Sequence, residues 1–303
     1  KNISVSDFKN KIICLSLVLK DLGIKQGDTV GIFANSSPFW LIFDFAILQV
    51  GAISVPIFAN ISTTNLNFEI KDSAMKFMFI DSQERLKDIE KENSHLTFIT
   101  HNFCIKEPNF YNFDEILVIG KQICDSTGFT SFEANPDDVF SIIYTSGNTG
   151  TPKGVMLSHK NIVTQLHDIN KLIDLPKGEV ALSLLPLAHI FERTVMSYYL
   201  SRGISIYFVD DVLNVANLMK VVKPTIMTVV PRLLEKIFNK IKAQILEKPF
   251  FSRVIASLAF SYALKENLDK SSILFKIYDK LVYSKFREIF GSKVEKLVSG
   301  GAP

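Results

Sequence analysis

The stretch that decides the fold of this chain reads Tyr144-Thr145-Ser146-Gly147-Asn148-Thr149-Gly150-Thr151-Pro152-Lys153-Gly154. Its glycines allow positive φ and carry no Cβ, so backbone N–H groups can turn inward and form a concave nest for anionic oxygens. The threonine and serine hydroxyls add hydrogen-bond donors, and Lys153 adds a compact positive charge. This combination predicts a loop that holds phosphate groups.

The residues before the loop predict a buried strand, because positions 139–144 are apolar except for the small Ser141. Such a strand would deliver the loop to the edge of a sheet. The loop differs from the nucleotide-binding pattern G-x-x-x-x-G-K-[ST], since Pro152 precedes the lysine and Gly154 follows it. The alternative is a flexible Gly/Ser/Thr hairpin or linker. We disfavour it because a linker needs neither the lysine nor the buried strand.

Length and composition indicate a folded globular protein. At about 150 residues per domain, 303 residues predict two domains or one large domain with two lobes. Hydrophobic residues make up 47% and charged residues 21% of the chain, which argues against disorder. A net charge of +3 is too small to indicate nucleic-acid binding.

The cysteines and the apolar segments indicate the cellular compartment in which we expect the protein. Three widely spaced cysteines without a C-x-x-C pattern (Cys14, Cys104, Cys124) predict reduced thiols in a cytoplasmic protein. No secretory signal is visible at the start of the sequence. The most apolar stretch, 41–58, is interrupted by Asp44, Gln49, Gly51 and Pro56, so we expect a buried helix followed by a strand there.

The pattern of apolar residues predicts an α/β fold. Helical spacing over 8–22, ended by Gly23, predicts an amphipathic helix. Further along we expect strands over 29–34, 52–58, 77–80 and 96–99, with helices over 40–50 and 83–92 between them. This β-α-β alternation favours helix-flanked, mostly parallel β-sheets. Residues 101–138 are less regular, and we expect a connection between lobes there.

Beyond the loop the alternation continues. Ser158 is a candidate N-cap for a helix over 159–173, followed by a strand over 180–185. Two helix–strand pairs are predicted over 190–200 with 204–209 and over 212–221 with 225–230. Three helices over 233–246, 252–264 and 274–290 then precede a strand over 294–298.

The loop and the residues after it, through His159, closely resemble the signature loop of adenylate-forming (AMP-binding) enzymes. These include acyl-CoA synthetases, luciferases and the adenylation domains of peptide synthetases. Three more segments support the resemblance: 224–225 with 230–236, Ser299-Gly300-Gly301-Ala302-Pro303, and Leu184-Leu185-Pro186-Leu187-Ala188-His189-Ile190-Phe191-Glu192-Arg193. The last segment looks most like long-chain fatty acyl-CoA synthetases. Shorter matches to the family at 23–28, 35–36 and 51–56 extend the resemblance to essentially the whole chain.

The resemblance implies a two-step reaction of a fatty acid, ATP with Mg²⁺, and coenzyme A. A carboxylate attacks the α-phosphate to give an acyl-adenylate and pyrophosphate, and the thiol of coenzyme A then displaces AMP. The predicted catalytic residues are Lys153, Thr145 and His189, and no residue of this chain is assigned to a metal. The predicted nucleotide-binding residues are Thr145, Ser146, Gly147, Asn148, Thr149, Gly150, Thr151, Lys153, Gly300 and Gly301.

Several of these residues have a structural alternative. His189 would lie near the acyl carboxylate, or it is a capping histidine satisfied by its neighbours. For Glu192 and Arg193 we prefer an intrahelical or inter-element ion pair that orders the segment. Gly300 and Gly301 would line the adenine and acyl pocket, or simply end a strand. Arg232 could bind a phosphate, although an arginine near a helix start is more often structural.

The resemblance also predicts what lies outside 1–303. The sequence ends before the family's Tyr-Gly-x-Thr-Glu segment, its ribose-binding aspartate and its small C-terminal domain with the catalytic lysine. We therefore expect a partial N-terminal adenylation domain, with two sheet-containing lobes and little synthetase activity of its own. The alternatives are a ligase for an aromatic or short-chain acid, and a non-catalytic nucleotide- or acyl-binding module. Peripheral membrane contact is compatible with a fatty-acid substrate, but no basic amphipathic helix stands out.

Overall fold

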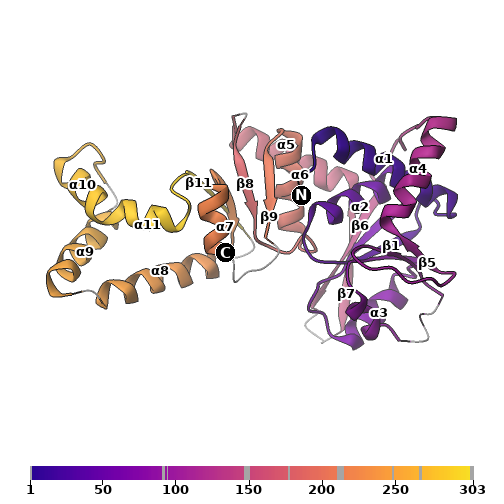
Figure 1. Ribbon diagram of the computed structural model, residues 1–303, viewed down its shortest axis with the longest axis horizontal. Helices are drawn as coiled ribbons and strands as arrows, with labels where there is room; N and C mark the ends of the chain where they lie inside the picture. Colours follow the sequence, from indigo (N-terminus) through magenta and orange to yellow (C-terminus); the bar gives the residue numbers. More distant parts are fainter. Residues whose placement is uncertain are drawn as a thin grey trace. The chain divides into compact units, whose positions relative to one another are not determined.

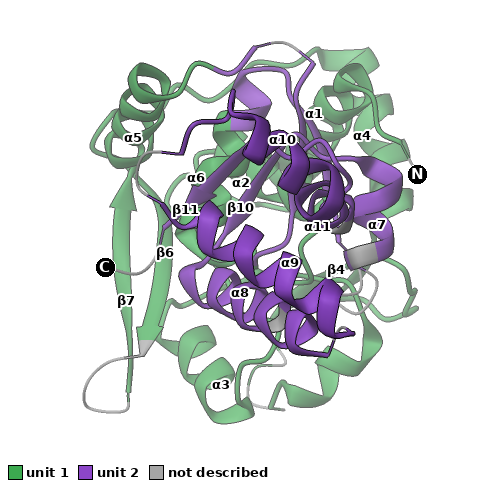
Figure 2. Cartoon of the chain, turned by 90° about the vertical axis from the view of Figure 1, so that its left-hand side faces the viewer, with its two compact units in different colours: residues 1–174, 186–198 green, residues 175–185, 199–303 purple. Residues whose placement is uncertain are grey.

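The computed structural model describes residues 2–90, 93, 95–146, 151–176, 178–209, 215–247, 249–265 and 268–300. The chain divides into two compact units (Figure 2). The first unit comprises 1–174 with 186–198, and the second comprises 175–185 with 199–303. Each unit has its own β-sheet among the described residues (Figure 1).

The first unit is built on a seven-stranded sheet with the order β5-β4-β3-β1-β2-β6-β7. Its strands are β1 Thr29–Phe33, β2 Ile53–Pro56, β3 Phe77–Ile80, β4 Thr97–Thr100, β5 Phe110–Asn112, β6 Val139–Ser146 and β7 Pro152–Ser158. Neighbouring strands are parallel except β6 and β7, which pair antiparallel. All five residues of β1 are buried, as expected for a parallel strand covered on both faces. The predicted α/β class with mostly parallel sheets is confirmed.

The helices of this unit begin where the sequence offers a capping side chain. They are α1 Val5–Asp21, α2 Pro38–Gln49, α3 Thr63–Asp72, α4 Phe113–Thr127, α5 His159–Leu172 and α6 Ile190–Ser201, which continues into the second unit. The hydroxyls of Ser4, Ser37, Ser62 and Ser158 each accept a hydrogen bond from a backbone N–H in the first turn. The predicted cap at Ser158 is confirmed, and Asn161 completes a capping box.

Three predictions for this unit need correction. The charged segment expected to be a helix over 83–92 forms a 3₁₀-helix, Gln83–Asp88. Residues 101–138 are not a connection between lobes, because β5 and α4 lie there within the first unit. The helical spacing of Phe113, Ile116 and Gly120, which are the buried residues of α4, was the missed signal. Strand β7 was missed because Pro152 and Gly154 made its start look like loop.

The second unit has a four-stranded parallel sheet with the order β11-β10-β8-β9. Its strands are β8 Val180–Ser183, β9 Ser205–Phe208, β10 Ile226–Val229 and β11 Lys296–Ser299. The helices are α7 Val215–Val222, α8 Pro231–Leu246, α9 Phe250–Ala263, α10 Ile273–Tyr278 and α11 Ser284–Ile289. A π-helix, Asp279–Tyr283, joins α10 to α11, so the helix predicted over 274–290 is three consecutive segments. Leu182, Met219, Met227 and Val229 form the buried core.

Helices α1 and α4 approach each other closely at Gly120. A Cβ placed on Gly120 would collide with the backbone carbonyl oxygen of Cys14. Because the obstacle is backbone, no side-chain rotation can relieve the collision. A residue without a side chain is therefore required for these two helices to pack as they do.

We expect Gly120→Ala to destabilise the chain by about 1–3 kcal/mol through overpacking, although alanine is the better helix former. Val118→Ala is the control, because Val118 is on the same helix and is 61% exposed. The measurement is the free energy of unfolding in urea. A Gly120→Ala variant as stable as the Val118→Ala variant would contradict the close approach.

Candidate functional site

The predicted phosphate loop connects the two strands of an antiparallel hairpin, β6 and β7. Thr145 pairs directly with Lys153 across the hairpin, and Ser146 pairs with Pro152. Directly opposite residues of an antiparallel pair project from the same face of the sheet with their Cβ atoms about 5 Å apart. The Thr145 hydroxyl and the Lys153 ammonium group, both on exposed residues, therefore share one face next to the loop. The strands that flank the loop thus form a hairpin, and the phosphate-holding role of the loop stays a prediction.

Several predicted loop residues cannot be placed. Gly147, Asn148, Thr149 and Gly150 lie outside the described residues, and only the backbone of Ser146 is described. Thr151 is exposed at the start of the return toward β7.

The opposite face of the hairpin is anchored to α3 by Tyr144. Its hydroxyl donates a hydrogen bond to Asp72 Oδ2 at 2.6 Å. A Cβ on the cross-strand partner Gly154 would lie 2.9 Å from Ile142 Cγ2 and 3.2 Å from Tyr144 Cζ. Glycine at 154 thus leaves room for the ring. Burial and the hydrogen bond to Asp72 raise the pKa of Tyr144, so its hydroxyl stays protonated and remains a donor.

A buried carboxyl group lies near this anchor. Glu69 of α3 is 5% exposed, and burial raises its pKa to about 7. Its charge also contributes to raising the pKa of Tyr144. Near neutral pH a change in the ionisation of Glu69 therefore changes the charge that is buried on α3, the helix that holds the hairpin.

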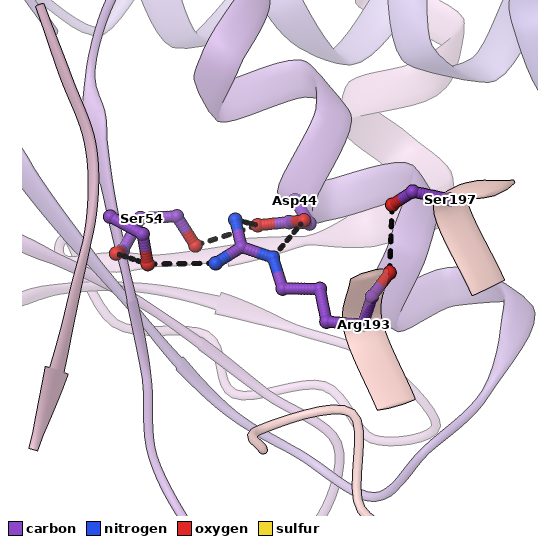
Figure 3. A network of polar contacts seen from close by, with 5 residues as sticks. Asp44, Ser54, Arg193 and Ser197 are labelled. Atoms are coloured by element: carbon purple, nitrogen blue, oxygen red, sulfur yellow. Dashed lines mark hydrogen bonds and ion pairs between the residues drawn. The ribbon is translucent and has the colours of Figure 1, made fainter. Parts of the chain in front are cut away.

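The guanidinium of Arg193 on α6 makes three buried hydrogen bonds in this unit (Figure 3). Its Nε donates to Asp44 Oδ2 at 2.8 Å, and its Nη2 donates to Asp44 Oδ1 at 2.6 Å. Both side chains are almost completely buried, at 2% and 3% exposed. The ion pair that we preferred for Arg193 is confirmed, and it joins α6 to α2.

Two serines complete the network around this ion pair. Arg193 Nη1 donates to Ser141 Oγ at 2.7 Å, and Ser141 Oγ donates to the carbonyl oxygen of Ser54 at 2.8 Å. Ser54 Oγ donates to Asp44 Oδ1 at 2.7 Å. The Phe140 ring lies 4.8 Å from the guanidinium carbon. The network thus ties α6 to β2 and to β6, the strand that carries Thr145.

His189 stands at the start of α6 and is exposed. Its Nδ1 accepts a hydrogen bond from the backbone N–H of Phe191 at 3.2 Å, and its ring lies 6.4 Å from the Phe58 ring. Just before it, the Leu187 N–H donates to Ser36 Oγ at 2.8 Å. These contacts match the capping alternative for His189, and its catalytic role stays a prediction.

The strand register and one ring contact place the predicted catalytic residues toward the same edge of the sheet. Strands β2 and β6 are parallel, and Ser54 pairs with Ser141. Phe58 and Thr145 each come four residues later, so they lie at a similar height along the strand direction. The ring contact with Phe58 brings His189 to this carboxyl edge. Ligands of open α/β sheets bind at this edge. Apart from the family resemblance, the sequence offered no reason to place His189 at this edge.

The remaining predicted residues belong to the second unit. Gly300 directly follows β11 and is partly buried, whereas Gly301 lies outside the described residues. Arg232 is exposed in the first turn of α8. In the described part of the chain, no group of three or more His, Cys, Asp or Glu residues could hold a metal ion.

Comparison with known families matches residues 1–303 to the family described as AMP-binding enzyme. The chain therefore belongs to this family, as the signature loop predicted.

Named relatives of the chain are acyl-CoA synthetases. Long chain acyl-CoA synthetase 3 of Arabidopsis thaliana is 30% identical over 97% of this chain and 47% of its own length. Long-chain-fatty-acid--CoA ligase 5 of Mus musculus is 30% identical over 100% of this chain and 47% of its own length. The chain thus spans about half the length of the curated relatives that it matches.

Solved structures confirm the fold. The A domain of carboxylic acid reductase from Segniliparus rugosus, in complex with AMP and a co-purified carboxylic acid, matches with a TM-score of 0.74 at 17% identity. That match covers 100% of this chain and 50% of the other. A Mycobacterium tuberculosis fatty acyl CoA synthetase matches with a TM-score of 0.68 at 18% identity, over 99% of this chain and 50% of the other.

We expect Arg193→Met to cost roughly 3–5 kcal/mol of folding free energy, because it leaves the Asp44 carboxylate buried without its cation. The double variant Arg193→Met/Asp44→Leu should cost less, since it removes both charges. Urea unfolding of both variants and the parent measures the coupling. If the double variant is the less stable of the two, the ion pair is not what holds these elements together.

Stability should also depend on the ionisation of Glu69. The folded chain binds this proton more tightly than the unfolded chain, in which the carboxyl pKa is near 4.5, so the free energy of unfolding falls as pH rises from about 4.5 to about 7. Glu69→Gln should therefore be more stable than the parent at about pH 8, by roughly 1–3 kcal/mol, and nearly equal at about pH 4. Glu84→Gln, at an exposed position, is the control. An equal gain in the free energy of unfolding at both pH values would contradict a raised pKa of Glu69.

Proposed function

We propose that the protein containing this chain is an acid–thiol ligase that activates a long-chain fatty acid with ATP and transfers the acyl group to coenzyme A. The activation step yields an acyl-adenylate and pyrophosphate, and the transfer step releases AMP. The observation that carries the proposal is the Thr145–Lys153 pair on the hairpin of an AMP-binding family member. The names of the relatives support the choice of a long-chain fatty acid.

The residues of the hairpin would act on the leaving group. Displacement at the α-phosphate builds negative charge on the departing pyrophosphate, and fixed donors aimed at that charge lower the barrier. Lys153 would supply the positive charge and Thr145 a hydroxyl donor from the same face. The loop between them would add the backbone N–H groups that its glycines leave free.

His189 would face the acyl carboxylate from the start of α6. Its Nδ1 accepts the Phe191 N–H, so in the neutral ring the proton resides on Nε2. That nitrogen can donate a hydrogen bond to a carboxylate oxygen and help to aim it at the α-phosphate. Gly300, at the end of β11, would admit the adenine or the acyl chain.

Two further groups belong to the proposal. Mg²⁺ would enter with the phosphates of ATP and neutralise part of their charge. Coenzyme A would be the second-step acceptor. As for the compartment, we propose the cytoplasm, which the three free cysteines support.

The alternatives differ in what the protein would activate. A ligase for an aromatic or short-chain acid would keep the same hairpin and change the acyl pocket. A non-catalytic nucleotide- or acyl-binding module would bind ATP without exchange. The complete set of donors in the loop favours catalysis, because a non-catalytic domain has no physical reason to retain every one of them.

The test is fatty-acid-dependent exchange between ATP and pyrophosphate in the whole protein. We expect Lys153→Met to lower the exchange rate about 10²- to 10³-fold, the usual cost of one transition-state donor. Lys160→Met is the matched control, because Lys160 is an exposed lysine in the first turn of α5. Palmitate, benzoate and acetate are compared as substrates. Exchange with benzoate or acetate but not with palmitate would replace the fatty acid as the proposed substrate. Absence of exchange with every acid would overturn the proposed ligase activity.

A further inference from the structure

Helices α1 and α4 bring two of the three cysteines to one interface. The two helices lie side by side in Figures 1 and 2, and a Cβ on Gly120 of α4 would come within 2.8 Å of Cys14 Cα on α1. Cys124 follows Gly120 by four residues, so it lies one helical turn, about 5.4 Å, further along the same face of α4. The close approach at Gly120 therefore brings Cys124 to the part of α1 that carries Cys14.

The Cys124 thiol is also an electrostatic neighbour of the Cys14 thiol. Burial raises the pKa of Cys14, and so does Cys124, which acts on Cys14 more strongly than the other nearby charged groups, Lys11, Asp125 and Lys121. Charge interactions fall off with distance and are screened by salt, so the strongest partner lies close by. The electrostatics of Cys14 thus agree with the packing of the two helices.

The pair is open to chemistry because neither thiol is fully enclosed. Both Cys14 and Cys124 are half-buried and both are free. Cysteines that only fill a core are buried and inert, whereas reactive ones are partly exposed. A metal site does not account for the pair, since no group of three or more His, Cys, Asp or Glu residues in the described ranges could hold a metal ion. Two adjacent, accessible thiols without a third ligand favour redox chemistry.

We propose that Cys14 and Cys124 are a modification site, a dithiol that hydrogen peroxide converts into a disulfide between α1 and α4. One thiolate attacks the peroxide, the O–O bond breaks, and a sulfenic acid and one water form. The other thiolate attacks that sulfur, so the S–S bond forms, the S–O bond breaks and a second water leaves. Two electrons pass from the sulfurs to the peroxide, and both thiol protons end in water.

The disulfide would fasten the first helix of the chain to the helix that precedes β6. Strands β1 to β5 lie between the two cysteines, so the cross-link closes a long loop and stabilises the folded chain relative to the unfolded one. Because the pKa of Cys14 is raised, little of it is thiolate at neutral pH, and the reaction is slow until peroxide accumulates. Disulfides of this kind in the cytoplasm are transient and sense redox conditions. The proposal does not depend on the ligase activity, since oxidation needs neither ATP nor coenzyme A.

The test is oxidation of the whole folded protein with hydrogen peroxide. Remaining thiols are blocked with N-ethylmaleimide, and the tryptic peptides are analysed by mass spectrometry without reductant. Trypsin cuts after lysine and arginine, so Cys14 lies in peptide 12–20 and Cys124 in peptide 122–153. We expect these two peptides to be joined by a disulfide that dithiothreitol releases. Oxidation should also raise the melting temperature by about 5 °C or more.

Three single variants separate this pair from general thiol oxidation. Cys14→Ser and Cys124→Ser should each abolish the joined peptides and the rise in melting temperature. Cys104→Ser is the matched control, because Cys104 is an exposed cysteine between β4 and β5, and it should leave both results unchanged. Circular dichroism confirms that each reduced variant is folded.

Three outcomes would overturn the proposal. The first is the absence of joined peptides 12–20 and 122–153 in the oxidised parent protein. The second is a main product in which Cys104 is joined to either of the other cysteines, because the α1–α4 interface would then not direct the reaction. The third is a rise in melting temperature that persists in Cys14→Ser or Cys124→Ser.

Discussion

The buried ion pair between Arg193 and Asp44 is the interaction on which the first unit depends. Taking two charges out of water is costly, and the cost is offset only when every donor and acceptor finds a partner. Here both carboxylate oxygens accept from the guanidinium, and Ser141 takes the remaining nitrogen. The requirement for complete pairing fixes α2, β2, β6 and α6 in one arrangement (Figure 3).

That arrangement connects the two segments that carry the predicted chemistry. Ser141 lies four residues before Thr145 on β6, and the backbone N–H of Arg193 donates to the carbonyl oxygen of His189 at 3.2 Å. One residue therefore contacts both the strand that leads to the predicted phosphate loop, through its side chain, and the residue before α6, through its backbone. On the other face of the hairpin, Tyr144 ties the same strand to α3. Buried contacts of Ser141 and Tyr144 thus hold the β6 end of the glycine-rich loop.

Much of the fold and part of the site follow from local patterns. The spacing of apolar residues predicted most helices and strands, and serines marked the starts of several helices, because capping and periodicity act within a few residues. The composition of the loop indicated a phosphate site. Helix α4 and strand β7 escaped prediction, since β7 is recognisable only from its pairing with β6 and its Pro and Gly resemble a turn. Asp44 and Ser141 appeared in the sequence as interruptions of apolar runs, although they are the partners of Arg193.

The sequence by itself determined the α/β class and the family resemblance and predicted the phosphate-loop chemistry, because each is carried by residues close together in the chain. Only the tertiary structure decided which polar residues meet inside it. Asp44 and Arg193 are 149 positions apart, and no local pattern reports a contact over that distance. The same holds for Thr145 and Lys153, whose shared face follows from the strand register.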